Sequence, residues 1–165
     1  MINSIGNNYI SIESTGEVTY PLQCSFYAYL AAAKNNVTGD GTTYTIPFDS
    51  ELYDRNSDFN TGTGYFVAPV TGIYYLSASV LLVGGSTKTG SYTDIYNVTQ
   101  ATSLVTKLES LGGSSILDNS SSCDTIVLLT AGDNISVTTR CFGGTLTADV
   151  SANSSYTFFS GGLVC

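Results

Sequence analysis

The chain has 165 residues, of which 42% are hydrophobic and only 11% are charged, and its net charge at pH 7 is −8. The thirteen acidic residues outnumber five scattered basic ones, so we expect neither a nucleic-acid partner nor an anionic membrane surface. No apolar run approaches the roughly 20 residues of a membrane helix, which excludes membrane insertion by a helix. The length suits one domain.

The first twenty residues read as a separate segment. Two short strand-like pieces flank Gly16, and Pro21 follows them. We therefore expect residues 1–20 to be a leader or connector from an upstream stalk and residues 21–165 to be the domain. The opening MINSIGNNYI lacks the basic and apolar regions of a signal peptide. Secretion by another route, a cytosolic state before assembly, and a fragment of a longer chain remain open at this stage.

The domain has the periodicity of strands. In GIYYLSASVLL (72–82) an apolar set alternates with a mixed set, and the other runs are rich in Val, Ile, Thr, Tyr and Phe. Those other runs are TYTIPF (43–48), SYTDIYNV (91–98), DTIVLLT (124–130), NISVTT (134–139) and SYTFFSGGLV (155–164). Glycine-containing turns separate them, at 39–41, 62–64, 84–85, 112–113, 132–134 and 143–144. Short strands with frequent turns predict an all-β sandwich or barrel.

Two segments have helix-forming composition, residues 28–34 (AYLAAAK) and residues 104–110. Both are too short to be stable helices on their own, so we predict strands there as well.

One long stretch, residues 48–80, resembles the signature of the C1q-like domain family, part of the C1q/TNF-like group. The signature spaces aromatic residues, one Asn or Asp and one Gly at fixed intervals. The positions that match are Phe48, Asp54, Phe59, Phe66, Gly72 and Tyr74. Two later positions depart from the pattern, because Leu76 and Ala78 stand where the family usually has aromatic residues, so packing there, or at a subunit contact, could differ.

A second resemblance lies downstream, and the two together run from about Cys24 to the C-terminus. Gly132 and Asp133 match the turn that precedes a strand in the family, and Phe159, Ser160 and Gly161 match its final strand. The physical properties of the matched residues agree with this resemblance. Their large aromatic side chains offer large areas for burial in a core. Gly72 could allow a special torsion or a close backbone approach at the start of a strand.

The resemblance implies a jelly-roll β-sandwich of about ten antiparallel strands that assembles as a homotrimer. Such domains usually sit at the end of a collagen-like or fibrous stalk. Within the family, the stretches NVTGDGTTYTIPFDSELYDRNSDF and ISIESTGEVTYPLQ are similar to fibre heads of phages, viruses or bacteria.

Catalysis has little support in the sequence. The chain has no His, which excludes Ser-His-Asp and Cys-His arrangements, and no spacing singles out a pair of its thirteen acidic residues for glycoside hydrolysis. We therefore predict no enzymatic activity and name no catalytic residue.

Calcium is the one cofactor that the sequence leaves open. Residues 54–60 carry oxygen ligands at alternate positions, but Phe59 and Tyr65 occupy the positions where an EF-hand needs Gly and Glu. A different calcium site, or simply a polar loop, stays open there. Because some members of the family hold calcium, the carboxylates that could do so here are Asp54, Asp58, Asp118, Asp124 and Asp133.

The four cysteines are Cys24, Cys123, Cys141 and Cys165. They are widely spaced and have no His beside them, which argues against zinc. A disulfide between Cys123 and Cys141 could form if their strands were neighbours. Free thiols are the favoured reading, because four cysteines in a chain of this length are not disulfide-dense.

One strand-like run suits sugar binding. Tyr92, Asp94 and Tyr96 place aromatic rings beside a carboxylate, although sheet packing or a trimer contact would explain the same residues.

We expect a head domain on a trimeric fibre or surface protein, extracellular on a virion, phage fibre or bacterial surface. It would bind itself and a cell-surface receptor, glycan or protein ligand through exposed loops. Two alternatives are a purely structural trimerisation and capping module and a secreted pattern-recognition protein.

Overall fold

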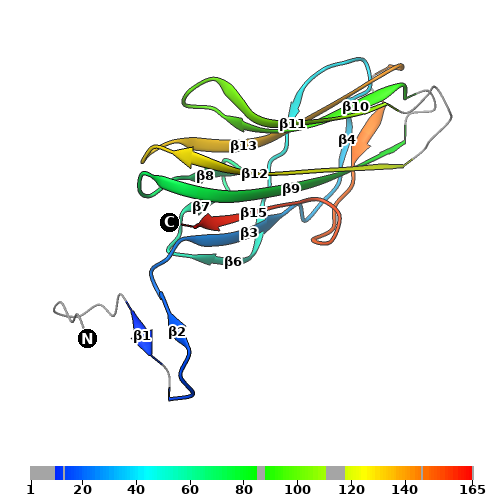
Figure 1. Cartoon of the computed structure of the whole chain (residues 1–165). Helices are drawn as coiled ribbons and strands as arrows, with labels where there is room; N and C mark the ends of the chain where they lie inside the picture. Colours follow the sequence, from blue (N-terminus) through cyan, green and yellow to red (C-terminus); the bar gives the residue numbers. More distant parts are fainter. Residues whose placement is uncertain (1–9, 13, 85–87, 111–117, 146, 165) are drawn as a thin grey trace.

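The protein is a two-layered β-sandwich with a separate N-terminal hairpin (Figure 1). The computed structural model describes residues 10–12, 14–84, 88–110, 118–145 and 147–164. Every strand pair within these residues is antiparallel. The predicted all-β sandwich is confirmed.

The first layer is a six-stranded sheet in the order β11-β10-β13-β8-β7, with β5 also paired to β13. Its strands are β5 (Tyr44–Thr45), β7 (Phe59–Asn60), β8 (Tyr65–Val67), β10 (Gly90–Asn97), β11 (Thr102–Ser110) and β13 (Asn134–Phe142).

The second layer is a seven-stranded sheet in the order β4-β14-β9-β15-β3-β6, with β12 also paired to β9. Its strands are β3 (Ser25–Tyr29), β4 (Lys34–Thr38), β6 (Ser50–Arg55), β9 (Gly72–Gly84), β12 (Asn119–Leu129), β14 (Ala148–Val150) and β15 (Phe158–Leu163).

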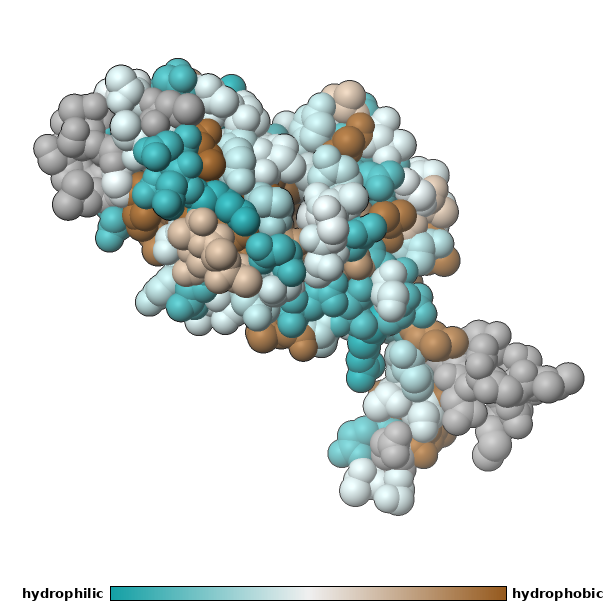
Figure 2. Space-filling model, turned by 180° about the vertical axis from the view of Figure 1, so that it is seen from behind, coloured by the Kyte–Doolittle hydropathy of each residue, from teal (hydrophilic) through white to brown (hydrophobic). Residues whose placement is uncertain are grey.

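The N-terminal hairpin lies beyond one end of the sandwich in both views (Figures 1 and 2). It consists of β1 (Ser11–Ile12) and β2 (Val18–Thr19), in register from Ser11 opposite Thr19 to Ile12 opposite Val18. The two predicted strand-like pieces around Gly16 are these strands.

The number of strands exceeds the expected ten, because the described residues form fifteen. The excess comes from pieces of two or three residues, such as β5 and β7, which carry no readable alternation. The strand prediction for residues 104–110 is confirmed, because they lie in β11. Residues 28–34 are not helical, but only Ala28, Tyr29 and Lys34 lie in strands; residues 30–33 connect β3 to β4, so the strand predicted there is wrong over these four residues. The predicted turn at 112–113 lies outside the described residues.

Strand β9 shows how the sequence alternation produces two unlike faces. Tyr74, Leu76 and Ala78 are completely buried between the layers. Ile73 and Tyr75, on the opposite face, are about 40% exposed. Successive side chains of a strand point to opposite faces, so one set reaches the core and the other leaves it.

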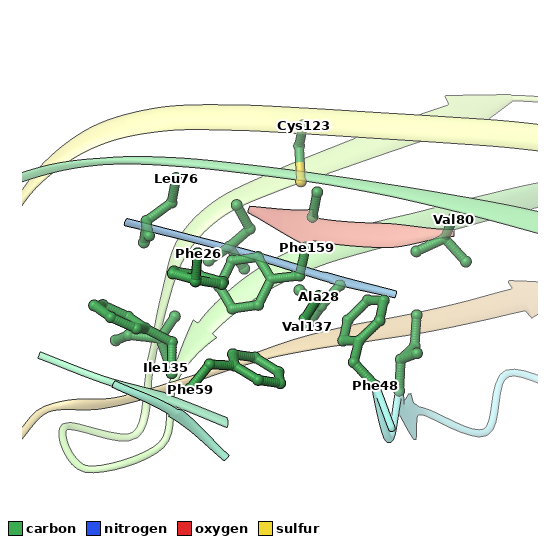
Figure 3. Packing of buried hydrophobic residues seen from close by; sticks show 14 of the residues in the cluster. Phe26, Ala28, Phe48, Phe59, Leu76, Val80, Cys123, Ile135, Val137 and Phe159 are labelled. Atoms are coloured by element: carbon green, nitrogen blue, oxygen red, sulfur yellow. The ribbon is translucent and has the colours of Figure 1, made fainter. Parts of the chain in front are cut away.

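Aromatic rings fill the space between the layers (Figure 3). Phe26 of β3 stacks on Phe66 at 4.7 Å and on Phe59 at 5.3 Å, and it meets Phe159 edge-on at 5.0 Å. Phe48 lies 6.1 Å from Phe159. Because these rings come from both sheets, their contacts bind the layers together.

The signature positions 76 and 78 also face this core. Ala78 lies opposite Phe159 of β15 and opposite Cys123 of β12 in the strand registers. The departure from the family pattern at Leu76 and Ala78 therefore changes the packing between the two layers. Because both side chains are fully buried within one chain, the expectation that they alter a subunit contact is wrong. Gly72 begins β9 without a left-handed torsion, so the expectation of a special torsion there is wrong too.

Gly161 lets the last strand approach its neighbours. A Cβ atom built on Gly161 would lie 2.7 Å from Cδ2 of Leu76 and 2.8 Å from the carbonyl oxygen of Tyr75, with the Phe26 ring at 3.1 Å. The first two distances are shorter than any ordinary contact, and one involves backbone. Only glycine fits this position without displacing β9.

Replacing Gly161 by alanine is therefore expected to lower the free energy of unfolding by about 1–3 kcal/mol, the usual cost of overpacking a core. Denaturant unfolding measures the change. Gly62→Ala is the matched control, because the nearest atom there is the side-chain oxygen of Asn60 on the surface and φ is not left-handed. Equal effects of the two substitutions would contradict the packing argument.

Candidate interaction surface

The outward face of the seven-stranded sheet carries large apolar side chains in adjacent strands. Ile126 and Leu128 of β12 are 68% and 66% exposed. Ile126 lies opposite Tyr75 and Leu128 opposite Ile73 on β9. These four residues, Ile73, Tyr75, Ile126 and Leu128, form what we call the apolar face. Contiguous exposed apolar patches are typical of surfaces that contact another molecule.

Aromatic residues extend the same sheet surface across β3, β6 and β15. The rings of Tyr27 and Phe158 stack at 5.1 Å, and Tyr53 lies 6.3 Å from Tyr27. Between them and the apolar face run small residues, with Ser160 opposite Ser77 in register. Tyrosine and aliphatic side chains around small residues are suited to close contact with another protein surface.

Sequence reasoning missed Ile126 and Leu128, although a signal was present. In the run IVLL at 126–129, Val127 and Leu129 contact the core while Ile126 and Leu128 point outward. An apolar run without alternation is typical of strands that are covered on both faces. The run IYYL at 73–76 of β9 has the same property.

The two acidic signature residues hold turns. Asp54 lies near the end of β6 and accepts hydrogen bonds from the backbone N–H of Phe59 at 2.9 Å and of Asp58 at 3.3 Å. The residues between, Asn56 and Ser57, have φ values of 89° and 59°. The carboxylate therefore satisfies the backbone of a turn that the left-handed residues bend sharply.

Asp133 is buried in the turn between β12 and β13. It accepts hydrogen bonds from the backbone N–H of Thr130 at 2.9 Å and from Nε2 of Gln100 at 2.8 Å. Gly132 beside it has a φ of 89°, a conformation that glycine adopts without strain. The turn is thereby tied to the loop that joins β10 to β11.

The five candidate calcium carboxylates are dispersed. Asp54 and Asp58 share the β6–β7 turn, Asp124 points outward from β12, and Asp118 precedes β12. Within the described ranges, no group of three or more Cys, Asp and Glu residues is arranged to hold a metal ion. Calcium binding stays a hypothesis without a placed site.

The cysteines do not form the disulfide that the sequence left open. Cys24, Cys123 and Cys141 are free and buried. The strands of Cys123 and Cys141 belong to different sheets, since β12 pairs with β9 while β13 pairs with β10, β8 and β5. The preference for free thiols is confirmed for these three residues; Cys165 lies outside the described residues.

The three residues singled out for sugar contact share one face. Tyr92, Asp94 and Tyr96 all point away from the core, on the outer surface of the six-stranded sheet, while their β10 neighbours Thr93 and Ile95 are buried. Sheet packing between the two layers is therefore not their role.

The C1q domain family matches residues 28–164, which is most of the chain. The chain belongs to the C1q domain family. This C1q domain shares the fold of three solved structures. The first is the globular domain of zebrafish complement 1qA protein, at 18% identity and a TM-score of 0.58 over 87% of this chain and 98% of that one.

The other two are TNF-like. Murine APRIL at pH 5.0 is 17% identical with a TM-score of 0.64, covering 86% of this C1q domain and 99% of the APRIL chain. Eiger TNF from S. frugiperda is 17% identical with a TM-score of 0.58, covering 87% and 92%. At these identities the likeness establishes the C1q/TNF-like fold. No curated protein matches the sequence. No helix among the described residues is long and apolar enough to cross a membrane.

The buried thiols of this C1q domain are expected to be unreactive in the folded protein. Burial raises the pKa of Cys123 to about 12, and burial also raises the pKa of Cys24 and of Cys141. The reactive thiolate is therefore scarce at pH 8. In a Cys165→Ser variant, Ellman's reagent should titrate no thiol in the native state and three after unfolding in guanidinium chloride. Rapid reaction of any of these three thiols with Ellman's reagent in the folded protein would contradict their burial in the core.

Proposed function

We propose that this chain is the trimeric head of an extracellular fibre or surface protein, holding three chains together and binding a receptor or glycan on a cell surface. The observation that carries the proposal is the apolar face of the seven-stranded sheet. Domains of the C1q family are typically trimeric and bind ligands.

Self-association explains the apolar face better than solvent exposure does. Ile126 and Leu128 each leave about two thirds of their surface open in the single chain. Covering such side chains contributes roughly 25 cal/mol for each Å² of apolar area removed from water. A second and third copy of the chain would supply surfaces of the same apolar and aromatic character.

Ligand recognition would then use the loops and the sheet that the trimer leaves open. Loops on a rigid sandwich can vary without disturbing the core. Three identical sites in one particle would also raise avidity for a surface that displays many copies of the ligand.

The N-terminal segment, residues 1–20, would connect the head to an upstream stalk. Its hairpin leads into β3 from beyond the end of the sandwich (Figure 1). Together with the resemblance of residues 36–59 to fibre heads, this supports a place on a virion, a phage fibre or a bacterial surface. Binding and assembly, rather than catalysis, are the proposed roles.

A charge placed in the apolar face tests the assembly. Leu128→Asp would force a carboxylate into the subunit contact, so the solution mass should fall from near three chains of 17.3 kDa to one. Light scattering behind a sizing column gives the mass.

Leu108→Asp is the matched control. Leu108 is 56% exposed on β11, in the other sheet, so the same substitution there should leave a trimer. A wild-type monomer would overturn the trimeric head. If the protein is a trimer but binds to neither a glycan array nor a cell surface, the result would instead favour a purely structural capping module.

A further inference from the structure

A polar groove crosses the outer surface of the six-stranded sheet. It has a volume of about 460 Å³, within the range of ~300–1,000 Å³ of small-molecule sites. Residues from β5, β8, β10, β11 and β13 line it, among them Tyr65, Asp94, Tyr96, Thr106, Thr138 and Arg140.

The hollow follows from the strand registers. Asp94 on β10 lies opposite Thr106 of β11 and Thr138 of β13, and Thr138 lies opposite Thr45 of β5. Small hydroxylated residues on β5, β11 and β13 therefore make the floor of the groove around Asp94 of β10. The larger side chains of Tyr65, Tyr96 and Arg140 line the groove as well.

Asp94 is held as a hydrogen-bond acceptor. It accepts hydrogen bonds from Oγ of Ser103 at 2.8 Å and from Oγ1 of Thr106 at 3.1 Å. A carboxylate has about four acceptor positions, so it can accept further hydrogen bonds from a ligand. The side chain of Asp94 is only partly exposed, and this burial raises its pKa.

Arg140 is held as a hydrogen-bond donor. Its guanidinium carbon lies 4.3 Å from the centre of the Tyr92 ring and 5.4 Å from that of Phe142. Stacking of this kind orders the group while leaving its N–H edge free to donate. No ion pair joins Arg140 to Asp94, both of which the structure describes. The groove thus offers an acceptor and a donor that are not joined in an ion pair, although the charge of Arg140 still stabilises the carboxylate of Asp94.

We propose that this groove binds a short neutral saccharide. Asp94 accepts hydrogen bonds from sugar hydroxyls, Arg140 donates to ring or hydroxyl oxygens, and Tyr65 and Tyr96 lie against the C–H face of a sugar ring. The inference deepens the proposed head function and rests on it, because a glycan is the ligand that the groove assigns to the head.

Other ligand classes fit less well. The net charge of −8 disfavours polyanions, and the lining mixes hydroxyls and charges with aromatic rings where a purely apolar ligand would leave the polar groups unpaired. In Figure 2 hydrophilic residues predominate on the visible face and apolar ones are scattered. The groove belongs to the sheet opposite the apolar face, so a trimer closed through that face leaves three grooves open.

The test uses the full chain, labelled fluorescently, on an array that carries neutral and acidic oligosaccharides. The neutral saccharides that retain the wild type should be bound at least tenfold more weakly by Asp94→Asn and by Tyr96→Ala. The first removes the carboxylate charge with little change of shape, and the second removes the ring. Glu17→Gln in the exposed hairpin makes the same chemical change as Asp94→Asn and should bind like the wild type.

Melting temperature and solution mass are measured for each variant, so that loss of binding counts only in a folded protein. Retention of no neutral saccharide overturns the proposal, and so does equal binding by wild type, Asp94→Asn and Tyr96→Ala. Binding of acidic saccharides alone, strengthened by Asp94→Asn, overturns the neutral ligand in favour of an anion at Arg140. If the protein is a trimer but binds no sugar, only the assignment of the groove to a saccharide is wrong. If it is a monomer that binds sugar, only the proposal of a trimeric head is wrong.

Discussion

The sandwich depends on one cluster of aromatic rings that joins its two layers. Phe26 touches rings from β7, β8 and β15, and Phe159 extends the cluster to Phe48. The cluster closes because Gly161 brings β15 against β9 without a side chain in the way. This packing fixes which side chains of each strand point outward, because a shift of one residue in a strand would exchange its two faces.

The two sheets use their outer faces for different chemistry. The seven-stranded sheet presents Ile126 and Leu128, which water solvates poorly, while the six-stranded sheet presents Asp94, Arg140 and tyrosines around a hydroxylated floor. A sandwich with two such faces can assign self-association to one and ligand contact to the other. Substitutions on one face then leave the other nearly unaffected, since the packed core separates them.

The strands and the core were predictable because alternation and aromatic spacing are local properties of the sequence. Phe59 and Phe159 could be assigned to the interior in this way. Asp94 and Tyr96 could be grouped for sugar contact because they share one strand. The apolar face and the rest of the groove lining could not be predicted, because each joins residues that are distant in the chain, such as Tyr75 with Ile126, or Asp94 with Arg140. The free state of Cys123 and Cys141 likewise depends on which sheet each strand enters. Short strands such as β5 and β7 carry too few residues for any period to be read.

The position of β15 constrains how the chain can acquire its structure. This strand contains the last described residues of the sandwich, yet it lies between β3 and β9 inside the seven-stranded sheet (Figure 1). During synthesis, the facing edges of β3 and β9 stay unpaired until residues 158–163 have left the ribosome. The domain is therefore expected to close in a late, all-or-none step, and a chain interrupted before Phe158 would expose two unpaired strand edges and the aromatic cluster to aggregation.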